Sequence, residues 1–241
     1  MILSRRRVLI SLCAFLLLAL SVVMSLVELD RRLSDAALSD AVSRQPSVLL
    51  DAGHGGPDGG AVSNGIREAD VNLAVTLRLR DFLTLMGFRV TLTRDGDYSV
   101  HSSNASTLRE MKHSDLMNRL AMMKSPDGEI SVSIHQNIYE EAYVHGAQVF
   151  YGAAESSREL AELIQKNVAQ VIQKDNRRRI KEADSTLFIL KNNTVNPSVM
   201  VECGFLSNPA EAQNLKDPAY QSALAVVIGA SVVTFAGTGS Y

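Results

Sequence analysis

The sequence has little cysteine and no excess of basic charge. Among its 241 residues only Cys13 and Cys203 are cysteines. Cys13 lies inside an apolar run, so a disulfide between the two is implausible. The formal net charge is −2 and the pI is about 6.2. Because nucleic-acid-binding proteins usually carry a basic patch or have a basic pI, this balance argues against nucleic acid as a partner.

The composition is otherwise that of a globular protein. Hydrophobic residues make up 46% of the chain and charged residues 21%, which are ordinary fractions for a folded domain. The length allows one or two domains. A chain of this size buries a sizeable core without disulfide support.

An uncharged apolar run from Val8 to Val27 follows three arginines at positions 5–7. Twenty residues in a helix extend about 30 Å, the thickness of a bilayer core. A secretory signal peptide has a shorter apolar region and a small-residue cleavage site, and no convincing A-x-A site follows this run. The sequence therefore favours an uncleaved transmembrane anchor. Since positive charge stays cytoplasmic, we expect the rest of the chain outside the cytoplasm.

This anchor divides the chain into four predicted parts. They are a cytoplasmic basic end (1–7), a transmembrane anchor (8–27), a polar linker (28–46) and a globular domain (47–241).

The globular part alternates predicted strands and helices. The expected strands cover Val48–Leu50, Phe88–Leu92, Ile130–Ile134, Ala147–Tyr151, Leu187–Leu190 and Ser198–Val201. The expected helices cover Val71–Met86, Leu116–Met123, Ser157–Ile172, Pro209–Leu215 and Tyr220–Phe235. The polar stretch Thr93–His113 is expected to be a long surface loop. Alternation of this kind predicts an α/β fold with a mostly parallel sheet.

Three polar side chains follow predicted strands. His54 comes after the first strand, His135 ends the third and Glu202 ends the last. In open α/β sheets, ligands bind at the carboxyl ends of the strands. We therefore expect these three groups to converge at one edge of the sheet.

Four short segments contain the residue types that metal-dependent hydrolysis requires. A catalytic zinc takes three nitrogen or oxygen ligands and keeps one position open for water, and a carboxylate that does not bind the metal removes a proton from that water. The segments are D-A-G-H-G-G (51–56), R-E-A-D (67–70), S-I-H-Q-N (133–137) and V-E-C-G-F-L-S-N-P (201–209).

In this order, the four segments resemble the zinc-dependent N-acetylmuramoyl-L-alanine amidases of the amidase_3 type, from about Val48 to the C-terminal helix. The resemblance implies that His54, Glu68 and His135 bind Zn²⁺ and that Glu202 is the general base. It also implies a six-stranded sheet flanked by helices, with 47–241 as the catalytic domain.

The compact anchored form more loosely resembles the sporulation and cortex (CwlD-like) subgroup. The resemblance implies hydrolysis of the amide between N-acetylmuramic acid and L-alanine in peptidoglycan, on the path to muramic-δ-lactam in the spore cortex. It implies a membrane-anchored protein with an extracytoplasmic catalytic domain, in the forespore–mother cell intermembrane space. Peptidoglycan is then the substrate, and an activating protein is a further partner that such enzymes allow.

Each of the four site residues has a structural alternative. A histidine at 54 caps a glycine-rich loop, Glu68 interacts favourably with a helix dipole, and His135 is a hydrogen-bonded core histidine. A carboxylate at the end of a buried strand, as at Glu202, is costly unless it is paired or functional. The glycines around His54 could suggest a phosphate loop, but the Lys-Ser/Thr that would reach phosphate and magnesium is missing. They favour a sharp backbone turn beside the metal.

Two other functions remain open from the residues. One is a metal-dependent peptidase that acts within the peptidoglycan stem peptide, and the other is an inactive peptidoglycan-binding scaffold. Neighbouring positions have less certain roles. Asp51 and Asn137 are candidates for orienting the histidines, and Gln136 for altering substrate fit. Arg94 and Arg119 match family arginines or form surface ion pairs. Only Gln136 to Gly146 separate His135 from the next strand, which leaves little room for a helix that would block the site.

Overall fold

The computed structural model describes residues 20–21, 23–35, 45–125 and 130–238. The chain divides into two compact units, Met1–Gln45 and Pro46–Tyr241. In the first unit, positions 20–21 and 23–35 are helical with exposed side chains. The predicted cytoplasmic end (1–7) and most of the predicted anchor (8–27) lie outside the described residues, so the anchor stays a prediction.

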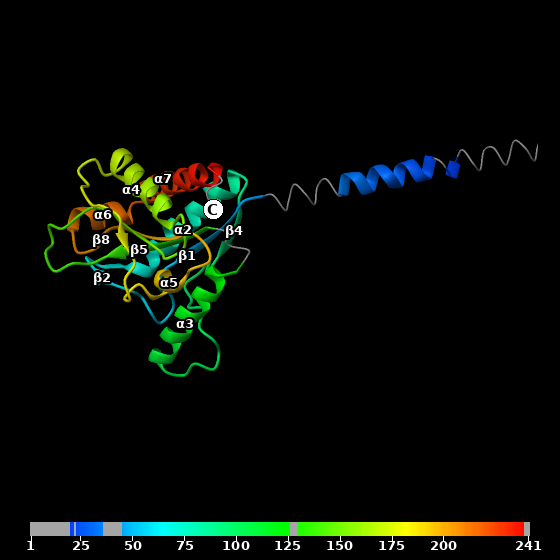
Figure 1. The fold of residues 1–241 in the computed structure, drawn as a ribbon. Coiled ribbons are helices and arrows are strands. Elements are labelled where there is room, and N and C mark those ends of the chain that lie inside the picture. Colours follow the sequence, from blue (N-terminus) through cyan, green and yellow to red (C-terminus); the bar gives the residue numbers. More distant parts are fainter. Residues whose placement is uncertain (1–19, 22, 36–44, 126–129, 239–241) are drawn as a thin grey trace, which may run out of the picture. The chain divides into compact units, whose positions relative to one another are not determined.

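The second unit contains a six-stranded sheet in the order β4-β1-β5-β8-β6-β7 (Figure 1). All neighbouring pairs are parallel except β6 and β8, which are antiparallel. The predicted mostly parallel, six-stranded sheet is therefore confirmed. The strands are β1 (Ser47–Ala52), β4 (Arg89–Leu92), β5 (Ile130–Asn137), β6 (Gln148–Tyr151), β7 (Lys181–Glu182) and β8 (Ser198–Phe205).

Helices cover both faces of this sheet, as Figure 1 shows. One layer contains α2 (Glu68–Leu85), α4 (Ser157–Val171), α6 (Pro209–Lys216) and α7 (Pro218–Gly237). The other contains α3 (Leu108–Met123) and α5 (Phe188–Asn192). Among the described residues, α7 is the one helix with the length and apolarity to cross a membrane, and half of its apolar window is buried. Because α7 packs against α2 and α4, we interpret it as a core helix of the domain.

Alternate residues of the central strands point to opposite layers, because side chains in a strand have a period of two. Ile130, Val132 and Ile134 of β5 join the main apolar core under α2, α4 and α7. Val199, Val201 and Cys203 of β8 join the same core. The residues between them face α3 and α5. His135 and Glu202 are on this second face, and the parallel register pairs them directly.

The predicted strand at Leu187–Leu190 is wrong. These residues enter the short helix α5, in which Ile189 and Leu190 are buried. A short apolar run has no period that separates a buried strand from a buried helical turn. The sixth strand is instead β7, whose Lys181 and Glu182 are both exposed. A charged two-residue edge strand has no hydrophobic pattern, which is why the sequence did not indicate it.

The predicted surface loop Thr93–His113 is also partly wrong, because α3 begins at Leu108. Thr107 and Glu110 form a capping box, in which each side chain accepts a hydrogen bond from the other residue's backbone N–H. Thr-x-x-Glu is the sequence signature of a helix start. Thr93 and Arg94, at the other end of the stretch, are buried.

Candidate metal centre

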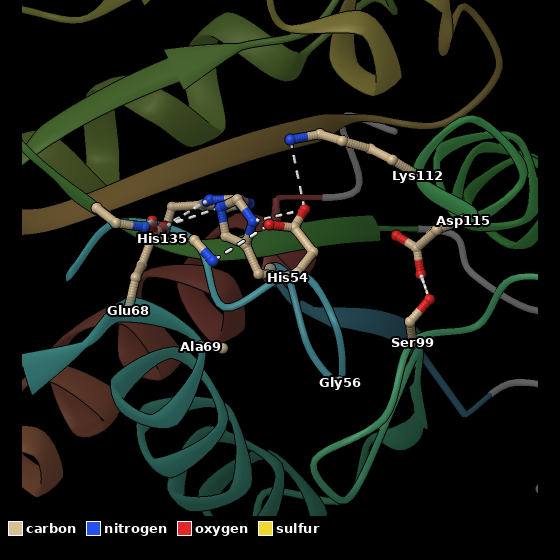
Figure 2. Close-up of polar contacts among 12 residues, drawn as sticks. His54, Gly56, Glu68, Ala69, Ser99, Lys112, Asp115 and His135 are labelled. Atoms are coloured by element: carbon tan, nitrogen blue, oxygen red, sulfur yellow. Dashed lines mark hydrogen bonds and ion pairs between the residues drawn. The ribbon is translucent and has the colours of Figure 1, made fainter. Parts of the chain in front are cut away.

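His54, Glu68 and His135 converge at the carboxyl edge of the sheet (Figure 2). Glu68 Oε1 lies 3.3 Å from His54 Nε2 and 3.0 Å from His135 Nδ1. The two imidazole rings are nearly perpendicular, with their centroids 5.0 Å apart. One donor atom from each residue lies within 4.8 Å of the others. Two imidazoles and one carboxylate are a ligand set of catalytic zinc, so these residues fit the metal that the sequence predicts.

The glycine-rich loop brings His54 close to its partners. His54 itself has φ = 61°, in the left-handed region that a non-glycine residue seldom adopts. A Cβ on Gly53 would lie 2.2 Å from His135 Nε2, and one on Gly60 would lie 2.6 Å from a Glu68 oxygen. Backbone strain of this kind occurs at functional sites, where the surroundings enforce it. The expected sharp turn beside the cluster is therefore present.

Glu68 is buried at the first position of α2 and is held as an anion. Its Oε2 accepts a hydrogen bond from the Ala61 backbone N–H at 2.9 Å, and Oε1 accepts one from the Gln136 N–H at 3.1 Å. Burial alone would raise the pKa of Glu68, but the hydrogen bonds and charges of His135 and His54 hold it well below its ordinary value. The carboxylate therefore needs no deprotonation before it binds a cation.

Asp58 orients His54 from the opposite side. Its Oδ2 lies 3.1 Å from His54 Nδ1, so Nε2 is the nitrogen that faces Glu68. Burial would lower the pKa of His54, but the hydrogen bonds to Asp58 and Glu68 raise it to about 9. A carboxylate on the second imidazole nitrogen fixes the ring of a metal-binding histidine. The sequence interpretation missed Asp58, although it stands four residues after His54 in the same loop.

Asn72 is a second residue that the sequence interpretation missed. Its Nδ2 donates to Gly53 O at 3.1 Å and to Glu68 Oε1 at 3.3 Å, and its Oδ1 accepts from Gln136 Nε2 at 3.2 Å. Gln136 is buried, so it supports Glu68 and does not shape the substrate-facing surface. Asn72 stands four residues after Glu68, and residues at this spacing on a helix are neighbours. This spacing could have indicated the contact from the sequence.

Arg94 and Arg119 are both buried, so the alternative that they form ion pairs at the surface is wrong. Arg94 donates to the carbonyls of Ala52, Gly53 and Ala69, each at 2.9 Å. Arg119 donates to the carbonyls of Ala52 and His54, each at 2.8 Å. The two guanidinium groups thus hold the backbone on which His54 is carried.

Asp51 and Asn137 do not contact the histidine rings through hydrogen bonds. Asp51 is fully buried and accepts hydrogen bonds from Arg119, Ser133 and Thr93. Burial alone would raise the pKa of Asp51, but Arg119 and its other partners lower it to about 2. Asn137 Oδ1 accepts from the Ile138 backbone N–H at 2.8 Å. Asp51 therefore acts through Arg119 on the His54 loop, while Asn137 closes the turn after β5.

Glu202 lies beside His135 within β8, which continues to Phe205 rather than ending at this residue. Its Oε2 atom is buried and has no hydrogen-bond partner. Burial raises the pKa of Glu202 to about 7. A buried polar atom without a partner is costly, so a carboxylate at this position calls for a functional explanation.

One cavity of about 280 Å³ contains His54, His135 and Glu202. Its other walls come from α3 and from the segment around α5, where Leu187, Phe188 and Ile189 lie. The connection from β5 to β6 contains no helix, in agreement with the expectation that no helical insertion blocks this cavity.

Known proteins share this sequence and fold. Residues 48–233 match the family described as Amidase_3, N-acetylmuramoyl-L-alanine amidase. The chain is 34% identical over 189 residues to the germination-specific N-acetylmuramoyl-L-alanine amidase of Bacillus subtilis, with 78% of each chain covered. It is similar to the structure of the CwlD amidase from Clostridioides difficile in complex with the GerS lipoprotein (37% identity, TM-score 0.76), which covers 80% of this chain and 100% of that one. An N-acetylmuramoyl-L-alanine amidase from Clostridium difficile 630 is also similar (26% identity, TM-score 0.70), with 80% and 98% covered.

Replacing Asp51 with Asn is expected to lower the free energy of unfolding by about 3 kcal/mol at neutral pH, because it removes the buried partner of Arg119. The pKa of Asp51 is about 2 in the folded protein and about 3.9 when unfolded. Its contribution is therefore fully present above about pH 4 and is lost as the pH falls through 2. Urea unfolding of both proteins between pH 2 and pH 8 measures the difference.

The matched control is Asp81→Asn, which breaks the exposed pair between Arg80 and Asp81 and should cost no more than about 1 kcal/mol. A difference for Asp51→Asn that is as small as the control's, or that grows as the pH falls, would contradict the role of Asp51 in compensating the buried charge of Arg119.

Proposed function

The chain belongs to the Amidase_3 family and is an N-acetylmuramoyl-L-alanine amidase, and on this premise we propose that it hydrolyses its amide in peptidoglycan with zinc held by His54, Glu68 and His135. Glu202 is the general base of this proposal. The observation that carries it is a His-Glu-His cluster whose two histidines line one cavity together with Glu202.

The cluster presents an anion and an oriented imidazole to a cation. Glu68 is anionic, and Asp58 directs the Nε2 of His54 toward it. Because the pKa of His54 is raised to about 9, metal binding at neutral pH would release its Nε2 proton. A catalytic zinc held by three such residues would keep one coordination position open for water. When bound, zinc supplies a Lewis acid that polarises the scissile carbonyl and acidifies water.

Glu202 moves the protons of the reaction. Its carboxylate takes a proton from the attacking water and then delivers it to the leaving L-alanine nitrogen. Because the pKa of Glu202 is raised to about 7 by burial, the group both accepts and releases a proton near neutral pH. Its side chain faces the same cavity as His54 and His135, which keeps the transfer within the site.

Two alternatives use the same residues differently. A peptidase would cut within the stem peptide with the same zinc and base, and its products would be shortened peptides. An inactive scaffold would not require Glu202 Oε2 to stay buried without a partner, at the cost that this entails. The family membership favours the amidase over both.

Replacing Glu202 with Gln is expected to lower kcat about 10²- to 10⁴-fold, because the general base is lost, while the bound zinc is retained. The full-length protein in detergent would be incubated with purified peptidoglycan, and its products and zinc content measured by mass spectrometry. Wild type should release intact stem peptides that begin with L-alanine, and a chelator should prevent this. Glu159→Gln, an exposed change on α4, is the control. Shortened peptides would support the peptidase alternative. Full activity of Glu202→Gln would show that Glu202 is not the general base.

We further propose that the enzyme acts in spore cortex formation. The similarity to a germination-specific amidase and to CwlD supports this role. In the proposed pathway the amidase exposes the lactyl carboxyl of muramic acid, from which muramic-δ-lactam is then made. Spores of a strain without the gene should therefore contain cortex lacking muramic-δ-lactam, as muropeptide analysis would show. Normal lactam content would remove the cortex role and leave the amidase assignment intact.

We also propose that residues 8–27 anchor the protein with its catalytic domain outside the cytoplasm, between forespore and mother cell. The apolar run behind three arginines supports this orientation. Protease added to intact protoplasts should then degrade the catalytic domain, as immunoblotting would show, and a cytoplasmic marker should stay intact. Full protection of the domain would overturn the orientation. An activating protein partner fits the same proposal, since the C. difficile CwlD structure contains the GerS lipoprotein.

A further inference from the structure

A second cavity, of about 190 Å³, extends the catalytic one along α3. The two cavities share the lining residues Asp58, Lys112 and Asp115. Beyond them, the second cavity is bounded by the loop residue Pro57 and by Leu108 and Met111 of α3. The two cavities are therefore adjacent, and Lys112 lies between them.

The two acidic side chains of this lining are engaged by the protein. Asp58 Oδ2 lies against His54 Nδ1, and its Oδ1 accepts from the Gly60 backbone N–H at 3.2 Å. Asp115 accepts hydrogen bonds from Arg119 Nε at 2.6 Å, from Ser99 Oγ at 3.0 Å and from the Val100 N–H at 2.8 Å. Figure 2 shows the Ser99–Asp115 contact beside the His54 loop.

Lys112 differs from both acids. Its side chain is 61% exposed, and its Nζ lies 3.5 Å from Asp58 Oδ2. Charge-assisted hydrogen bonds are typically about 2.7–2.9 Å long, so this contact is loose. An ammonium carries three donors. As Figure 2 shows, Lys112 extends from α3 toward the His54 loop, so its remaining donors are available at the junction of the two cavities.

Building on the proposed function, we infer that Lys112 binds a carboxylate of the peptidoglycan stem peptide and makes the enzyme selective for the free acid. The group concerned is the α-carboxylate of the D-glutamate that follows L-alanine. An extended peptide advances about 3.5 Å per residue, so this second residue lies about 7 Å from the scissile bond. Contacts of 3.5 Å and 3.1 Å, and one imidazole ring, separate the ammonium from Nε2 of His54. Pro57, Leu108 and Met111 form the apolar wall for the aliphatic part of the same residue.

The test measures the ratio of kcat/KM between two substrates, so a general loss of activity does not affect its result. Peptidoglycan chains would be prepared with the D-glutamate α-carboxyl either free or amidated, and kcat/KM measured on both with the full-length protein in detergent. Wild type should prefer the free acid by about 5- to 10-fold, the range of a partly exposed charge pair. Lys112→Gln should reduce this ratio to about one, and Lys112→Arg should keep it.

Lys191→Gln is the matched control, because Lys191 also lies 3.6 Å from an acidic partner, Glu182, and lines neither cavity. It should leave the substrate ratio unchanged. If Lys112 only supported Asp58 and His54, its loss would slow both substrates equally and leave the ratio intact, which overturns the inference. A wild-type preference for the amide would also overturn it. Cleavage of neither substrate by wild type, with zinc and an activating partner supplied, would contradict the proposed function itself.

Discussion

The parallel pairing of β5 with β8 places the chemical groups of the site. In this register His135 lies beside Glu202 on the face toward α3 and α5, while their sequence neighbours fill the apolar core on the other face. A shift by one residue would turn every side chain of a strand to the opposite face. It would bury the histidine and the carboxylate in the core and expose valines and isoleucines at the site. The energy that packs the core therefore also fixes the positions of the ligand and the proposed base.

The rest of the site is held by buried polar contacts to a strained loop. His54 has a left-handed backbone, a conformation that costs free energy and persists only if the surroundings determine it. Arg94 and Arg119 hold His54 in this conformation, because their guanidinium groups donate hydrogen bonds to the carbonyls of the loop and of the strand before it. Asp51 neutralises Arg119 in the interior. A buried pair of this kind is weak evidence for extra stability, but here it fixes the direction of a backbone that carries a proposed metal ligand.

In the proposed mechanism, one cavity serves bond cleavage and the other serves recognition of the same substrate. The first is lined by His54, His135 and Glu202, the groups proposed for bond cleavage, and the second by charged and apolar side chains along α3. Asp58 belongs to both: it orients His54 on one side and contacts Lys112 on the other. A group recognised at Lys112 would thus lie two contacts away from the proposed metal ligand. This arrangement connects the recognition of the stem peptide with the geometry of the site through one carboxylate.

The sequence by itself determined the family and most of the fold. Strands and most helices were identified from local patterns, because periodicity is a property of short segments. His54, His135 and Glu202 were expected at one sheet edge because they follow predicted strands, whereas Glu68 and the proposed roles of all four came from the resemblance to the family. Only the tertiary structure decided what holds those residues. Asp58, Asn72, Arg94 and Arg119 have ordinary surface-type side chains in the sequence. The burial of Asn72, Arg94 and Arg119 and the half-buried position of Asp58 follow from packing between segments far apart in the chain. The helix at Phe188–Asn192 and the edge strand at Lys181–Glu182 were likewise decided by neighbours across the sheet, since segments this short have too few residues to show a period.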